Sequence, residues 1–147
     1  MFIGTFQHNI DAKGRLSIPA PFRDVINGTP EQGLIMTSNL GGCLVLYTTR
    51  EWALFIEKAK NLPTMNKTVK KFHRFIFSRA MACGLDKQGR ILISPTHREF
   101  AALDGETCRI GIQNKIEIWN CERWATEDAE TTTDPEGIQE AMADLGM

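Results

Sequence analysis

The stretch Asp11-Ala12-Lys13-Gly14-Arg15-Leu16-Ser17-Ile18 decides the fold, because the chain repeats it 75 positions later as Asp86-Lys87-Gln88-Gly89-Arg90-Ile91-Leu92-Ile93. In each copy an Asp and an Arg stand four residues apart and a glycine lies between them. Glycine readily takes the positive φ that a tight turn needs, and short apolar segments flank each turn. Each copy is therefore predicted to form a β-hairpin with an arginine beside its tip.

A second pair of segments repeats later in the chain. Leu44-Val45-Leu46-Tyr47 precedes Glu51-Trp52, and Ile116-Glu117-Ile118-Trp119 precedes Arg123-Trp124. Two copies are too few for a solenoid and instead predict a body with pseudo-two-fold symmetry. With 147 residues and 42% hydrophobic content, the chain can bury a full core, whereas half of it would be marginal alone. We therefore expect both halves to pack as one body.

Strand and helix signals come in the same order in both halves, which predicts an α+β fold of two pseudo-symmetric β-rich units with peripheral helices. The predicted strands of the first half are residues 5–10, 15–18, 34–37 and 44–47, and those after the second turn are 107–112 and 115–119. A short helix follows each turn. Longer helices are expected to begin at Thr48, where Glu51 completes a capping box, and near Asn120.

Four segments are expected along the chain. Residues 1–53 form the first unit, 54–79 a helical basic connector, 80–125 the second unit, and 126–147 an acidic tail that is partly helical or disordered. In the connector, an apolar face that includes Phe72 and Phe75 is predicted to pack between the two halves rather than to stack on bases.

The net charge of −1 conceals an asymmetry between the body and the tail. All 17 Lys and Arg lie at or before Arg123, against 11 acidic residues there, so this part carries +6. Residues 127–147 carry seven acidic residues and no basic one. A basic body is compatible with binding a polyanion, and on charge alone it is almost equally compatible with an ordinary solvated surface and a solubilising tail.

The repeated turn can orient an arginine. An Asp at the start of a turn accepts hydrogen bonds from turn amides and can hold the guanidinium of an Arg four residues later. The planar guanidinium can then grip a phosphate or bind the O6 and N7 edge of guanine. A single copy would be read as a surface ion pair worth about 0–1 kcal/mol. Two copies in register favour a repetitive partner such as DNA.

Other classes of function receive little support. Cys43, Cys83, Cys108 and Cys121 show no metal-ligand spacing, so we expect reduced, mostly structural cysteines, and neither a metal nor a cofactor. Asp86 with His97, or Cys83 near Asp86, could be imagined in catalysis but lack a complete set of nucleophile, base and orienting group. The chain is therefore predicted not to be an enzyme. No apolar run approaches about 18 residues and no export signal is visible, so a cytoplasmic protein that binds no membrane is expected.

These motifs together resemble the MraZ family of bacterial transcriptional regulators. The resemblance spans nearly the whole chain and rests on Met1-Phe2-x-Gly4, on both Asp-x-x-Gly-Arg turns with the strands after them, on Leu44-x-Leu46-Tyr47 with Glu51-Trp52, and on Asn114-Lys115-x-Glu117-x-Trp119. Each half resembles a SpoVT/AbrB swapped-hairpin unit.

The resemblance implies a DNA-binding repressor that assembles into a ring-like homo-oligomer and is nucleoid-associated. The implied target is double-stranded promoter DNA with short G-containing direct repeats, ahead of the division and cell-wall gene cluster that includes the regulator's own gene. The site residues carried over are Asp11, Lys13, Arg15, Asp86, Lys87 and Arg90. Gln88 replaces the positive charge of Lys13 in the second copy, so the first turn is expected to contribute more affinity.

An alternative of another class stays open at this stage. A swapped-hairpin body can serve as a protein-assembly or antitoxin-like module that has no specific DNA target. This alternative predicts indifference to promoter DNA.

Overall fold

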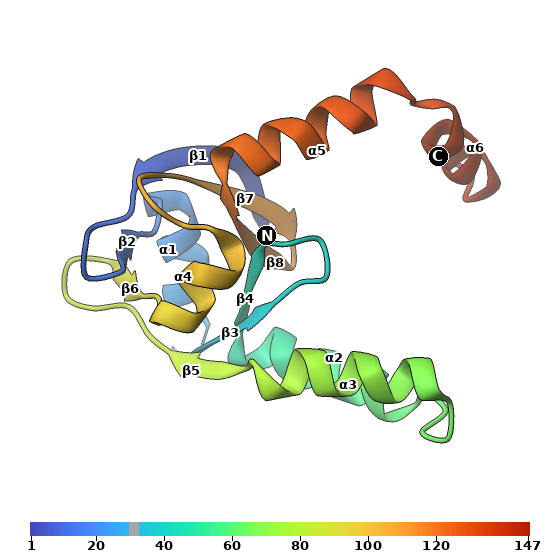
Figure 1. Cartoon of the computed structure of the whole chain (residues 1–147), viewed down its shortest axis with the longest axis horizontal. Coiled ribbons are helices and arrows are strands. Elements are labelled where there is room, and N and C mark those ends of the chain that lie inside the picture. The colour runs from blue at the N-terminus through green and yellow to red at the C-terminus, as the bar shows by residue number, and fades with distance from the viewer. Residues whose placement is uncertain (30–32) are drawn as a thin grey trace.

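The computed structural model describes residues 1–29 and 33–147, which form two runs of elements in the same order (Figure 1). The first run is β1 (Phe2–Asn9), β2 (Arg15–Ser17), α1 (Ala20–Asn27), β3 (Leu34–Ser38), β4 (Leu44–Thr48), α2 (Thr49–Lys60) and α3 (Lys67–Ser78). The second run is β5 (Met81–Cys83), β6 (Arg90–Leu92), α4 (Pro95–Ala101), β7 (Glu106–Gln113), β8 (Lys115–Asn120), α5 (Cys121–Thr133) and α6 (Glu136–Asp144). The predicted α+β class and the internal duplication are confirmed.

The strand pairing relates the two halves of the chain by an approximate two-fold symmetry. Six strands form an antiparallel sheet in the order β1-β7-β8-β4-β3-β5, with the equivalent strands β4 and β8 paired at its centre. A second, two-stranded sheet pairs β2 with β6, and Leu16 stands opposite Ile91 in its middle. Each half therefore contributes equivalent strands at equivalent places in both sheets.

The prediction of a simple hairpin at each repeated turn is wrong in its pairing. The strands that flank the first turn do not pair with each other: β1 pairs with β7 and β2 pairs with β6. Around the second turn, β5 pairs with β3. The physical reason is burial, because an isolated two-stranded hairpin covers too little apolar surface, whereas exchange between halves places Leu16 and Ile91 in one buried core. This exchange is the swapped-hairpin arrangement that the resemblance implied.

One apolar core unites the halves. Leu16 and Ile18 of the first half and Ile91 and Ile93 of the second are at most 1% exposed and belong to the same cluster. Phe22 of α1 closes the core below β1, in edge-to-face contact with Phe2 at 5.5 Å between ring centroids. The expectation that both halves pack as one body is confirmed by this shared core.

The helices that end each half form two arms. Thr48 caps α2 by accepting a hydrogen bond from the Glu51 amide at 3.2 Å, and Asn120 caps α5, as predicted. Ring contacts between Phe55 of α2 and both Phe72 and Phe77 of α3 hold the first arm together. Both arms extend from the body at the end away from the two turns (Figure 1).

The apolar face of α3 only partly joins the two halves. Phe75 contacts Phe100 of α4, in the second half, with 5.8 Å between ring centroids. Phe72, in contrast, packs on α2 of its own half. The structural reading of these phenylalanines is confirmed, but only Phe75 bridges the halves as predicted.

Candidate nucleic-acid interface

The first turn fixes its arginine through three hydrogen bonds to one carboxylate. Asp11 Oδ1 accepts from the backbone amides of Lys13 at 3.0 Å and Arg15 at 2.8 Å, and Asp11 Oδ2 accepts from Arg15 Nε at 2.8 Å. The carboxylate takes up Nε, and no hydrogen bond among the described residues uses the two terminal nitrogens of this guanidinium. Those two nitrogens can therefore donate together to an acceptor pair on a ligand.

The second turn repeats this geometry almost atom for atom. Asp86 Oδ1 accepts from the amides of Gln88 and Arg90, both at 2.9 Å, and Asp86 Oδ2 accepts from Arg90 Nε at 3.0 Å. The side chains of Arg15 and Arg90 are 37% and 29% exposed, so both remain accessible to a ligand. The sequence prediction that the Asp pre-orients the Arg is confirmed in both copies.

Backbone hydrogen bonds lock the two turns together. The Ile18 amide donates to the carbonyl of Gly89 at 3.0 Å, and the Ile93 amide donates to the carbonyl of Gly14 at 2.8 Å. The ladder between β2 and β6 places Arg15 opposite Leu92 and Arg90 opposite Ser17. The Cα atoms of the two arginines are thus offset by two residues along neighbouring strands. This offset is roughly 7 Å along the strand direction, which is about two base-pair steps.

Both turn glycines are required by geometry. Gly14 and Gly89 have φ of +88° and +73°, a region that side chains rarely adopt. A Cβ at Gly14 would lie 2.5 Å from the carbonyl oxygen of Ile93, and a Cβ at Gly89 would lie 2.5 Å from Cδ of Arg23. The glycines therefore permit the close approach by which each turn is braced from the other half.

Sequence reasoning missed two further arginines at this surface. Arg23 of α1 lies against Gly89 of the second turn, and Arg98 of α4 lies against Gly14 of the first turn. Arg23 donates to the carbonyl of Ile18 at 2.8 Å, and Arg98 donates to the carbonyl of Ala12 at 3.4 Å. Their equal distance from the two Asp-x-x-Gly-Arg motifs was visible in the sequence, but the crossing of each arginine to the opposite turn depends on the strand exchange.

Each turn borders a hollow that contains one of these bracing arginines. A pocket of about 380 Å³ is lined by Arg23, Asn27 and residues 85–89. Its counterpart of about 480 Å³ is lined by Arg98, Pro95 and residues 10–12, among others. Both hollows are open and polar in part, which suits a surface that contacts a large ligand more than a closed substrate pocket.

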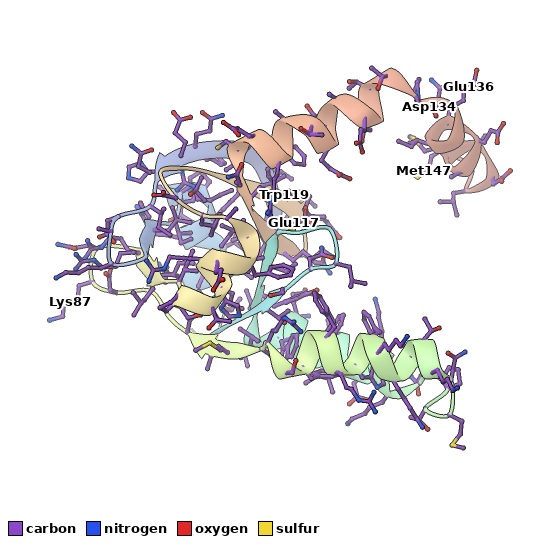
Figure 2. The ribbon with its side chains drawn as sticks, in the orientation of Figure 1. Lys87, Glu117, Trp119, Asp134, Glu136 and Met147 are labelled. Carbon is purple, nitrogen blue, oxygen red and sulfur yellow. The ribbon has the colours of Figure 1, made fainter. Side chains whose placement is uncertain are left out.

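The two predicted lysines flank the turns differently. Lys13 and Lys87 are both exposed, and no salt bridge in the described part of the chain involves either. Lys87 points away from the body at the turn end of the molecule (Figure 2). Because Gln88 rather than Lys87 donates the amide equivalent to that of Lys13, Lys87 corresponds to Ala12 and its charge sits one residue earlier in the turn.

The two aspartates are held in their charged form. Hydrogen bonds from backbone amides, chiefly that of Arg15, lower the pKa of Asp11 below its ordinary value, and the Arg90 amide does most to lower the pKa of Asp86. Both carboxylates are therefore ionised at neutral pH, and each keeps its arginine oriented.

The residues that could have suggested catalysis are not brought together. The His97 ring is buried and lies 2.7 Å from the carbonyl of Arg79, while Asp86 is engaged with Arg90. Burial raises the pKa of the Cys83 thiol to about 11, so it is not a reactive thiolate. Within residues 1–29 and 33–147, no group of three His, Cys, Asp or Glu side chains could hold a metal ion. Across the same ranges no helix is both long and apolar enough to span a bilayer.

Two interlocked swapped-hairpin units with their helices at the edges define the class of this protein, a tandem SpoVT/AbrB-like α+β fold. A family model described as "MraZ protein, putative antitoxin-like" matches residues 1–75 and again residues 76–144. The chain belongs to the MraZ family.

Relatives of known name match this chain over nearly their full length. A protein of Desulforamulus reducens is 43% identical over 145 residues, which cover 99% of both chains. Proteins of Pediococcus pentosaceus and Clostridium acetobutylicum are 41% and 40% identical and match over the whole of both chains. Each of these relatives is named transcriptional regulator MraZ. This chain is accordingly a transcriptional regulator of that family and not an enzyme.

Proposed function

We propose that this chain binds double-stranded promoter DNA sequence-specifically through its two Asp-x-x-Gly-Arg turns. The observation that carries the proposal is the duplicated carboxylate clamp, which holds Nε of Arg15 and of Arg90 and leaves their terminal nitrogens without a hydrogen bond among the described residues. A guanidinium presented in this way can make two parallel hydrogen bonds to the O6 and N7 atoms of guanine in the major groove. The proposed site comprises Asp11, Lys13, Arg15, Asp86, Lys87 and Arg90.

The members of the site have different roles. Arg15 and Arg90 read guanine, and Asp11 and Asp86 fix their orientation without touching DNA. Lys13 and Lys87 are exposed cations at the same end of the molecule and neutralise backbone phosphates, which adds affinity but no sequence preference. Two arginines about two base-pair steps apart favour a short G-containing target.

One chain neutralises few phosphates, so several chains are needed for tight binding. A ring-like homo-oligomer that presents many turns would bind an array of short direct repeats with avidity, and affinity would climb with the number of correctly spaced repeats. Occupancy of such an array in the promoter of the division and cell-wall gene cluster would repress that cluster and the chain's own gene, and would keep the protein on the nucleoid.

The experiment that tests the proposal replaces both arginines. We expect the Arg15→Ala/Arg90→Ala variant to lose specific binding to a promoter fragment with G-containing repeats in a mobility-shift assay that includes excess nonspecific DNA. Neither arginine belongs to the apolar core, so melting temperature and oligomer mass should stay nearly unchanged.

Arg50→Ala is the matched control, since it removes an exposed arginine from the opposite end of the molecule. Undiminished promoter binding by the double variant would refute the site. Indifference of the unmodified protein to every promoter fragment would instead favour the assembly or antitoxin-like module.

A further inference from the structure

The two arms are the parts of the molecule in which charge of one sign is in clear excess. Residues 49–79 carry eight basic and two acidic residues, which gives +6, whereas residues 127–147 carry −7. Basic and acidic residues balance in residues 1–48 and again in residues 80–126. The excess positive charge that the sequence assigned to the whole body is therefore concentrated in the α2–α3 arm, at the end of the molecule away from the turns (Figure 1).

The basic charge of this arm forms a stripe along α3. Lys67, Lys70, Lys71 and Arg74 follow the spacing of one helical face and are all exposed. Salt bridges within the described residues join Arg15 to Asp11, Arg90 to Asp86 and Lys60 to Glu57, and none involves this stripe. Four neighbouring like charges on one helix repel one another, so an acidic partner that covers the stripe lowers its electrostatic free energy.

No other part of the described chain covers the acidic arm. Neither α5 nor α6 buries any residue, and the side chains from Ala125 to Met147 are all exposed. Ile138, Met142 and Leu145, which share one face of α6, are 45%, 42% and 76% exposed. Figure 2 shows Asp134 and Glu136 at the far end of this arm, well separated from the basic arm in the view.

The two arms occupy equivalent places in the duplicated fold, since α2 and α3 end the first half as α5 and α6 end the second. Contact between two copies of the same arm would oppose charges of like sign. Contact between unlike arms would pair +6 with −7 and is the combination that electrostatics favours.

We propose that the acidic arm of one chain, residues 127–147, docks on the α3 stripe of a second copy. This contact is head-to-tail, so each chain uses one arm toward each neighbour, and repetition of the contact closes a ring when the rotation per chain allows it. The inference rests on the proposed function in one respect only, since the contact would join the chains of the ring that presents several turns to DNA. DNA is the less favoured occupant of the stripe, because the stripe and the turns lie at opposite ends of the chain (Figure 1).

A charge-swap experiment on the full chain tests the contact in the absence of DNA. One variant carries Lys67→Glu, Lys70→Glu, Lys71→Glu and Arg74→Glu. The other carries Lys at all seven acidic positions of residues 127–147, which changes the charge of that arm from −7 to +7. We expect each variant alone to fall to the monomer mass of 16.5 kDa in analytical ultracentrifugation near 150 mM salt. A chain that carries both sets, and an equimolar mixture of the two single-set variants, should recover multimers.

The matched control reverses Asp24 and Glu99, which are exposed acids outside the tail, and it should assemble as the unmodified chain does. Folding of each variant is verified by a cooperative thermal transition. If both single-set variants retain the unmodified mass, or if the doubly reversed chain stays monomeric, the proposed contact is wrong.

Loss of nonspecific DNA affinity without loss of assembly in the α3 variant would identify DNA as the occupant and would also overturn the inference. None of these outcomes alters the test of the turns, because Arg15 and Arg90 are unchanged in every variant. Failure of the arm contact is thereby distinguished from failure of the proposed DNA site.

Discussion

At the first turn the Asp11 carboxylate holds Arg15 Nε at 2.8 Å, and at the second turn Asp86 holds Arg90 Nε at 3.0 Å. At the other end of the molecule the equivalent arms differ by sign, +6 on residues 49–79 against −7 on residues 127–147. The duplicated fold therefore keeps one geometry where both copies are proposed to meet the same ligand. It carries opposite charges where the copies are proposed to meet each other.

The largest expected difference between the two turns concerns their glycines. Gly14→Ala would push a Cβ against the backbone oxygen of Ile93, which cannot move without disturbing the β2–β6 ladder, whereas Gly89→Ala would meet the Arg23 side chain, which can swing aside. We expect Gly14→Ala to lower the free energy of unfolding by about 2–4 kcal/mol and Gly89→Ala by about 1–2 kcal/mol. Urea denaturation of the two variants measures this, and equal losses would mean that the turns are braced alike.

A smaller difference is expected between the two lysines. Lys13 lies inside the hydrogen-bonded part of its turn, while Lys87 sits one residue earlier, so we expect Lys13 to be the closer of the two to phosphate. Lys13→Ala should reduce the slope of log affinity against log salt by roughly 0.9 per engaged copy, and Lys87→Ala should reduce it less. Fluorescence anisotropy over a salt series gives both slopes. A larger effect of Lys87→Ala would reverse the ranking of the turns.

The smallest effect is expected from the aspartates in acid. Their pKa values are lowered in the folded protein, so their stabilising contribution is complete above the ordinary carboxyl pKa and is lost as the pH falls through the folded pKa. Between pH 5 and pH 3, the melting temperature of the Asp11→Asn/Asp86→Asn variant should therefore fall less than that of the unmodified chain. Parallel loss of stability in the two proteins would show that the carboxylates do not hold the turns.

Local features of the fold were predictable because local chemistry determines them. The turn glycines, the cap at Thr48 and the carboxylate clamps each depend on residues within about four positions of one another. The partners of β1 and β2 were not predictable, because strand exchange depends on which distant segment buries the most apolar surface. The roles of Arg23 and Arg98 followed from that exchange and were missed with it. Since the two units interlock, the boundary between them at residues 53 and 80 stays a prediction.

The distribution of charge, too, could be predicted only in part from the sequence. The sequence gives the totals of +6 and −7, but the separation of the basic stripe from the turns needs the three-dimensional arrangement. An interpretation that assigned the positive charge to DNA contact was reasonable from the sequence. In the folded chain this charge lies at the end opposite the arginines proposed to read bases.

The central claim is that both guanidinium groups read guanine, and the most direct test compares Arg15→Lys and Arg90→Lys on matched probes. Lysine keeps the charge but cannot make the paired hydrogen bonds, so nonspecific affinity should survive. Discrimination between a repeat probe and the same probe with guanine replaced by adenine should fall by about 1–3 kcal/mol for each lost arginine. Full discrimination retained by both lysine variants would contradict the account.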